Sequence, residues 1–360
     1  MSTLRRLLMA HNMNQIRYPA NATVWELTIP EGGASYQFFT RNRSNSSVVD
    51  WGDGSVETLS ATGDKRIAHA YPAGNYTVSL TGAYDLLAMG DSNATYGKLV
   101  TGLLQVSEEL TSWANLCKYC AITELPAGFT VPYGITDVVS MLEFCKIPYL
   151  PDGFSLPETV TKSSRMFYGG GLKAIPRSFV LPRSVQTSDM MFWAIGTLSF
   201  DIEWFLQKIT AGCALTNLEG AFGNTVITGT APIERLSSLS TITKYSNCFL
   251  LCRDLDNFAE IPPSWGGGKV TLENQTIETG TDVNITIAKV YENYGHHGGY
   301  YGTKFASANL PSGLSLVFNM SSHPNSCELK GTLAAGTYTF DVTLSNTWSS
   351  ATATITLIVS

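Results

Sequence analysis

The sequence LPAGF at residues 125–129 returns as LPDGF at 150–154 and as IPRSF at 175–179. The step from each stretch to the next is the same, and Met141 and Met166 keep that step. A fixed period of roughly 20–50 residues is typical of repeat proteins, whose units bury their apolar faces only by stacking on their neighbours. The period therefore predicts a stacked array, which favours a binding or scaffolding role over catalysis.

The repeat continues beyond these units with less regular spacing. The residues that follow Phe192 at the equivalent position are Phe222 and Phe249, and both steps are longer than the step between the early repeats. The segment 200–206 has the pattern of a short helix, which an insertion between repeats would accommodate. We therefore predict that the array spans residues 108–265.

The repeat unit resembles the BspA-like leucine-rich repeats of bacterial surface proteins. It can be written Met-Phe-x-x-Cys-x-x-Leu-x-x-Leu-Pro-x-x-Phe-x-Leu-Pro-x-x-Val-Thr, with apolar anchors at fixed offsets and variable polar residues between them. The resemblance implies a solenoid of the leucine-rich-repeat type. It also implies a neighbouring domain, because a PKD-like domain often precedes such repeats.

The chain contains seven cysteines, an odd number. Cys117 and Cys120 have CxxC spacing, but no second pair follows at a zinc-finger distance. Cys120 and Cys145 occupy the same position in successive repeats. We expect small buried core residues in a repeat ladder, with a metal site or disulfides as the alternatives.

A turn motif precedes the repeats, within residues 22–82. Strand-like residues lead into a Gly-Asp-Gly turn, where glycine adopts positive φ and aspartate bonds its own backbone. The motif residues are Trp51, Gly52, Asp53, Gly54, His69 and Tyr71. They resemble a PKD domain, an immunoglobulin-like sandwich of extracellular proteins, and in that family they mainly build the fold. The resemblance therefore implies structural roles, with Asp53 as a cation ligand the weaker alternative.

Residues 266–360 begin with three glycines, which indicate a hinge, and continue with alternating strand patterns. Their order resembles the putative-immunoglobulin modules of bacterial and phage surface proteins. The departure is a loop rich in tyrosine, histidine and glycine, whose candidate binding residues are Tyr294, His296, His297, Tyr300 and Tyr301. Tyrosine offers rigid amphipathic area and glycine lets a loop adapt, so this loop suits a sugar or a protein contact. The alternative is a long hairpin tip packed on its own sheet.

These patterns predict a mainly β fold with an Ig-like (PKD) sandwich, a leucine-rich-repeat-type solenoid and a C-terminal Ig-like sandwich. The expected domains are an N-terminal arm at 1–21, the PKD-like domain at 22–82, a connector at 83–107, the repeats at 108–265 and the second sandwich at 266–360.

The composition excludes several functions. The net charge is −6 and only 14% of residues are charged, which argues against nucleic acid as a partner because phosphate binding needs a clustered basic surface. No stretch approaches 18 apolar residues, so no membrane insertion is expected. No catalytic motif appears. We expect neither an enzyme nor a cofactor or metal.

The start of the sequence is basic, but its apolar run is shorter than a signal peptide needs. Extracellular modules without such a signal favour a bacteriophage virion protein, a fibre or decoration made in the host cytoplasm. The arm at 1–21 would contact other virion proteins, and the distal modules would contact a glycan or protein of the bacterial surface. The alternatives are a bacterial cell-surface adhesin and a carbohydrate-active enzyme with accessory modules. A homo-oligomer is compatible with this interpretation, although no heptad repeat supports one.

Overall fold

The computed structural model describes residues 18–43, 46–60, 62–290, 303–319 and 325–360. The fold is mainly β, in agreement with the predicted class at that level. The chain divides into two compact units: Met1–Leu198 with Gln207–Leu215, and Ser199–Leu206 with Thr216–Ser360. Among the described residues, no helix combines the length and the apolar character that crossing a bilayer requires.

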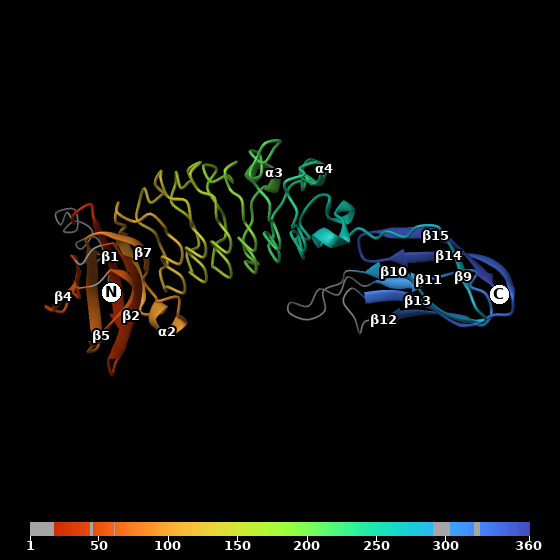
Figure 1. The fold of residues 1–360 in the computed structure, drawn as a ribbon, viewed down its shortest axis with the longest axis horizontal. Helices are drawn as coiled ribbons and strands as arrows, with labels where there is room; N and C mark the ends of the chain where they lie inside the picture. The colour runs from red at the N-terminus through yellow and green to blue at the C-terminus, as the bar shows by residue number, and fades with distance from the viewer. Residues whose placement is uncertain (1–17, 44–45, 61, 291–302, 320–324) are drawn as a thin grey trace. The chain divides into compact units, whose positions relative to one another are not determined.

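The first unit begins with two antiparallel sheets (Figure 1). The strands are β1 (Ala22–Ile29), β2 (Ala34–Asn42), β3 (Ser47–Asp50), β4 (Val56–Leu59), β5 (Gly63–Tyr71), β6 (Gly74–Thr81), β7 (Tyr84–Ala88) and β8 (Val100–Gln105), with the short helix α2 (Ala94–Gly97) between the last two. One sheet has the order β4-β3-β6-β1-β8, and the other has the order β5-β2-β7.

Large aromatic side chains fill the core of these sheets. Trp25, Tyr36, Phe38 and Trp51 are fully or almost fully buried. The ring of Phe38 lies 5.5 Å from that of Trp25 and 5.7 Å from that of Trp51. Because one aromatic residue buries about 150–250 Å², this small group contributes a large apolar area to the core of the two sheets.

Two strands of these sheets lie in the stretch 83–107 that the sequence patterns assign to a connector. β7 pairs with β2, and β8 pairs with β1. The same stretch also holds the first repeat, since the Met89 amide donates to the Leu116 carbonyl and the Ala121 amide to the Val100 carbonyl. The stretch is therefore part of the packed unit and not a linker.

Successive repeats of the first unit are joined by backbone hydrogen bonds. Over residues 138–144, every second amide donates to a carbonyl of the next repeat, as from Val138 to Lys162 and from Leu142 to Met166. The parallel bridges Asp137↔Lys162 and Lys162↔Thr187 belong to the same ladder. The period of the sequence therefore equals the step from one coil to the next.

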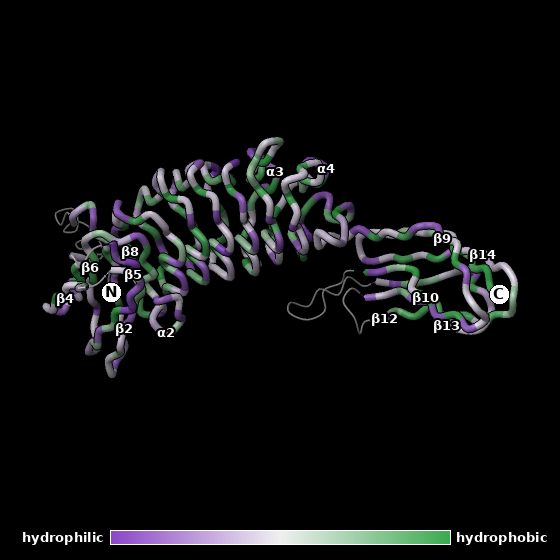
Figure 2. The backbone as a smooth tube through the Cα atoms, viewed as in Figure 1, coloured by the Kyte–Doolittle hydropathy of each residue, from purple (hydrophilic) through white to green (hydrophobic). Residues whose placement is uncertain are grey.

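Each coil turns through two left-handed residues. The second of these positions is occupied by Tyr119, Phe144, Gly169 and Ala194 in turn, with φ between 60° and 64°. Non-glycine residues seldom adopt this conformation, so its recurrence in successive repeats marks a repeated backbone path. Inside the path, Phe167 stacks on Phe192 with ring centroids 5.4 Å apart. Figure 2 shows hydrophobic and hydrophilic stretches alternating along the coils.

The second unit contains the later repeats with the same kind of ladder. The amides of Phe222 and Asn224 donate to the carbonyls of Cys248 and Leu250. The rings of Phe222 and Phe249 stack at 5.6 Å. The longer spacing contains the short helices α3 (Ile202–Phe205) and α4 (Ile233–Ser237), and α3 confirms the predicted helix near 200–206. Two single 3₁₀ turns, η1 (Phe258–Glu260) and η2 (Pro263–Trp265), end the array.

A second pair of sheets follows in the same unit. The strands are β9 (Gln275–Thr279), β10 (Asp282–Val290), β11 (Lys304–Ala306), β12 (Leu314–Asn319), β13 (Asn325–Thr332), β14 (Gly336–Ser345) and β15 (Ser350–Val359). They form the sheets β11-β14-β15-β9 and β10-β13-β12. β9 runs parallel to β15, and the other pairs are antiparallel. The core is mostly aliphatic, with Leu329, Ile355 and Leu357 fully buried.

Candidate binding surface

The motif at residues 51–71 is brought together in the first pair of sheets. The Nε2 atom of His69 lies 2.7 Å from Oδ2 of Asp53, and the Ser55 amide and hydroxyl both donate to Asp53 Oδ1. The hydrogen bonds from Ser55, followed by that from His69, hold the pKa of Asp53 at about 2. This carboxylate therefore fixes the turn while it remains ionised.

The aromatic members of the motif close the turn over the sheet. The His69 ring stacks on Trp51 with centroids 4.7 Å apart, and the Tyr71 hydroxyl donates to the Trp51 carbonyl at 2.8 Å. Burial, followed by the charge of Asp53, raises the pKa of Tyr71. Gly52 has a φ of 73°, and a Cβ there would overlap the backbone of Thr77. Gly54 is also left-handed. The hydrogen bonds and ring contacts of this motif therefore stabilise the turn and the sheet around it.

The predicted binding loop belongs to the C-terminal part of the chain. Its residues Tyr294, His296, His297, Tyr300 and Tyr301 lie outside the described residues. Binding through this loop stays a prediction.

All seven cysteines lie in the described part of the chain, where each is buried and none forms a disulfide. The Cys145 thiol donates to the Cys117 carbonyl. Burial raises the pKa of Cys145 and Cys252 to about 12. A thiol that remains protonated is a poor nucleophile and metal ligand. Among the residues that the structure describes, no group of three His, Cys, Asp or Glu residues is placed to hold a metal.

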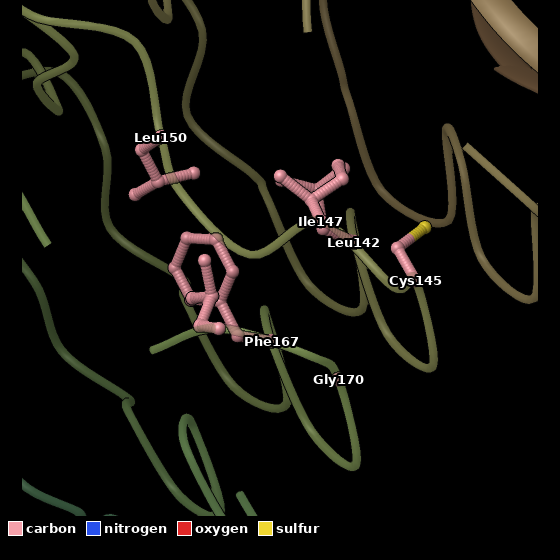
Figure 3. A pocket seen from close by; sticks show the side chains of 7 residues that line it. Leu142, Cys145, Ile147, Leu150, Phe167 and Gly170 are labelled. Carbon is pink, nitrogen blue, oxygen red and sulfur yellow. The ribbon is translucent and has the colours of Figure 1, made fainter. Parts of the chain in front are cut away.

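A small cavity lies inside the early repeats (Figure 3). Its volume is about 10 Å³, and its lining is apolar. The lining residues are Leu142, Cys145, Ile147, Leu150, Phe167, Gly170 and Leu172. A space of this size holds one water at most, and water needs polar partners. We therefore interpret it as a packing gap and not as a ligand site.

The more site-like feature is a row of aromatic and charged side chains at the turns of three successive coils. We call this row the aromatic edge, and its residues are Lys118, Tyr119, Glu143, Phe144, Arg165 and Tyr168. The left-handed residues Tyr119 and Phe144 donate their own amides to the next coil, at the carbonyls of Glu143 and Tyr168, so the backbone ladder holds these turns. Phe144 is 37% exposed, although large apolar side chains are mostly buried in this unit.

The rings of the aromatic edge contact one another from coil to coil. Tyr119 and Phe144 are stacked with centroids 5.0 Å apart and planes 7° from parallel, and Tyr168 meets Phe144 edge-on at 5.3 Å. A Cβ at Gly169 would overlap the Phe144 ring, so glycine is needed there. Tyr119 thus covers one face of Phe144, while the Phe144 side chain stays partly exposed.

One buried carboxylate ties the charged members together. The side chain of Glu143 has no exposed surface; it accepts from Arg165 Nη2 at 2.7 Å and from Arg165 Nε at 3.2 Å, and Lys118 Nζ lies 3.3 Å away. Burial alone would raise the pKa of Glu143, but the hydrogen bonds of Arg165 and Ser140 and the charge of Lys118 hold it below its usual value. The Arg165 guanidinium also lies 4.0 Å from the Tyr168 ring centroid.

The sequence patterns did not single out this edge. Tyr119 and Phe144 occupy equivalent positions in successive repeats, and Gly169 stands at the position that continues the series. The aromatic residue that the third coil contributes to the edge is Tyr168, one position before Gly169. The shift by one position hides the row from a search at a fixed period. A search for aromatic residues just before the repeated cysteine and glycine positions would have found it.

The comparisons with known proteins give one match, confined to the last part of the chain. Residues 268–360 match the model of the family described as Putative Ig domain. No curated protein and no solved structure matches the chain significantly. The match supports the Ig-like prediction for the second pair of sheets, and Ig-like domains are typical of surface and adhesion proteins.

Proposed function

We propose that this chain is a non-enzymatic adhesion protein whose residues 108–265 form a BspA-like leucine-rich-repeat solenoid between a PKD-like and an Ig-like sandwich. The observation that carries the proposal is the ladder of backbone hydrogen bonds that joins successive coils within each of the two units. A repeated backbone path presents side chains at regular intervals, and such arrays serve mainly as extended binding surfaces. The aromatic edge is the part of that surface with exposed recognition groups.

We further propose that the protein is a bacteriophage virion appendage, a fibre or decoration that contacts the surface of a bacterium. The cysteines support this, because a virion protein folds in the reducing cytoplasm of its host, where disulfides are rare. All seven cysteines lie among the described residues and are buried without a disulfide. In this proposal, residues 1–21 contact other virion proteins.

A cell-surface adhesin of a bacterium is the second candidate. The Ig-like match at residues 268–360 favours it, because such domains are typical of surface and adhesion proteins. Both candidates place the repeats outside the cell and assign them the same binding task.

Electron microscopy with an antibody against the chain separates the two candidates. Label on purified phage particles from the source of the gene supports the virion proposal, and label on intact bacteria alone supports the adhesin. Particles assembled with a chain that lacks residues 1–17 are expected to lose the label. Absence of label from both particles and cells contradicts the proposed function.

The non-enzymatic part has its own test. The purified chain is incubated with bacterial surface polysaccharide, and free reducing sugar is measured over time. We expect binding without any release of sugar. Steady release that scales with protein concentration would contradict this part and favour the carbohydrate-active enzyme.

A further inference from the structure

We propose that the aromatic edge binds an acidic glycan, one whose sugars carry carboxylates. This inference rests on the proposed adhesion function and names the class of ligand. The edge itself contains two cations, Lys118 and Arg165, on one buried carboxylate, Glu143. Lys146 follows Phe144 by two positions outside the edge, is exposed, and adds a third basic side chain to the turn segments 116–121, 141–146 and 165–171. The chain as a whole has a net charge of −6, so these turns carry an excess of basic groups on an acidic protein.

The single carboxylate leaves basic groups available. Arg165 uses Nε and Nη2 on Glu143, whereas its Nη1 has the Met190 sulfur at 3.7 Å. A thioether is a weak acceptor, so a ligand carboxylate that displaces this contact gains a charge-assisted hydrogen bond. Lys146 is exposed and follows Glu143 by three positions.

The aromatic groups supply the other half of a sugar site. The partly exposed Phe144 and the half-buried Tyr119 and Tyr168 are held rigid by their mutual contacts. Rigid aromatic side chains give apolar contact area at low entropic cost, and the CH groups of a sugar ring provide a matching apolar surface. Stacked coils repeat at about 4.8 Å, the spacing of paired strands, so a linear polymer can contact several coils at once.

The charge pattern separates this ligand from other polyanions. Binding to nucleic acid relies on many phosphate contacts from a large basic surface, and three basic side chains beside an acidic protein do not provide one. A carboxylated sugar carries one charge or fewer on each ring, which matches the small number of cations at the edge. We therefore favour an acidic glycan and treat a nucleic acid as an outcome of the test.

The test measures binding of the full-length chain to polygalacturonate, hyaluronate and polysialate by isothermal titration calorimetry. Dextran serves as the neutral control and single-stranded DNA as the phosphate control. We expect at least one carboxylated polymer to bind with an affinity that falls as salt rises, and dextran and DNA to bind more weakly. Failure of all three carboxylated polymers, or equal binding of dextran or DNA, overturns the inference.

Variants locate the site. Lys146→Glu reverses an exposed charge and is expected to weaken binding about tenfold, roughly one charge-assisted contact. Phe144→Ala is expected to weaken binding by about fivefold or more, and thermal melting checks that it remains folded. The matched control is Lys244→Glu, which makes the same change at an exposed lysine of the later repeats. Equal losses for Lys146→Glu and Lys244→Glu, or no loss for either, overturn the inference.

The outcomes keep the two proposals apart. If the chain labels particles or cells but binds no carboxylated polymer, the glycan inference falls and the proposed function stands. If the chain labels neither, the proposed function falls whatever the polymers show.

Discussion

The early repeats, up to residue 198, and the later repeats, from residue 216, have one backbone path and two different surfaces. In both, the second left-handed position of each coil is retained, at Phe144 and Ala194 in the early repeats and at Asn224 and Leu251 in the later ones. The later repeats keep this position although more of the sequence separates one coil from the next. Each coil therefore keeps its buried aromatic ring and its left-handed turn, while the number of residues per coil varies.

The two regions differ in what the turn presents. In the early repeats this turn carries the rings of the aromatic edge and the Glu143 ion pairs, whereas in the later repeats it carries Asn224 and Leu251. Packing restricts which residues the interior of a coil can hold, whereas the turn accepts different residues. We therefore expect interior substitutions to change the free energy of unfolding by similar amounts in the two regions, and turn substitutions to change it by different amounts.

The largest expected effect is the loss of a stacked interior ring. Phe167→Ala in the early repeats and Phe222→Ala in the later ones each remove a buried ring that stacks on the next coil. We expect both to lower the free energy of unfolding by about 3–5 kcal/mol, the usual cost of such a truncation. Hydrogen–deuterium exchange in urea, followed on peptides of each region, measures the two costs separately.

The control for this pair is Tyr133→Ala, at a side chain that is 85% exposed. It is expected to change stability by less than about 0.5 kcal/mol. A large cost for Phe167→Ala beside a negligible one for Phe222→Ala would show that the two interiors are not equivalent.

A smaller effect is expected from the ion pairs of the early turns. Glu143→Gln leaves Arg165 and Lys118 without their carboxylate, and we expect a loss of about 1–3 kcal/mol at neutral pH. Glu158→Gln is the matched control, because Glu158 forms an exposed pair with Lys208 and such pairs contribute little. Urea denaturation at neutral pH compares the two variants.

The acid dependence of the same variant follows from the direction of the pKa. Folding lowers the pKa of Glu143, so the charged form stabilises the fold above the unfolded pKa of about 4.3. That stabilisation is lost as the pH falls through the folded pKa. The difference between the parent and Glu143→Gln is therefore expected to shrink below about pH 4. A difference that grows in acid would contradict the assigned role of this carboxylate.

The repeat spacing was readable from the sequence because large buried residues recur. Phe192, Phe222 and Phe249 revealed the later coils despite their altered spacing. The turn at Trp51 could be predicted from the sequence because glycine supplies positive φ and aspartate bonds its own backbone in such turns. Local patterns of this kind depend on residues that are close in the chain or in a repeat.

Features that join residues remote in the sequence could not be predicted in the same way. β7 and β8 complete sheets whose other strands are remote in the sequence, and nothing local to 83–107 shows which strand they join. The aromatic edge combines residues from three coils, and its buried carboxylate looks like any surface glutamate in the sequence. Glu143 becomes a buried ion-pair partner only through its hydrogen bond from Arg165, which belongs to the next coil.

The smallest expected effect concerns the left-handed turns. Ala194→Gly relieves a strained φ of 63°, and we expect a gain of about 0.5–1 kcal/mol after the entropic cost of glycine. Asn224→Gly is expected to be nearly neutral, because asparagine tolerates this conformation. Thermal melting of both variants compares them, and destabilisation by Ala194→Gly would indicate that its turn is not left-handed.

The most direct test of the stacked coils is a disulfide between residues one period apart. The hydroxyls of Thr130 and Ser155 lie 3.4 Å apart and exposed, so Thr130→Cys with Ser155→Cys is expected to crosslink on mild oxidation. The control is Thr130→Cys with Val180→Cys, two coils apart at about 10 Å, which exceeds the reach of a disulfide. Non-reducing peptide mass spectrometry should find the first crosslink and not the second. Absence of the first, or equal yields of both, would contradict the stacking of one coil on the next.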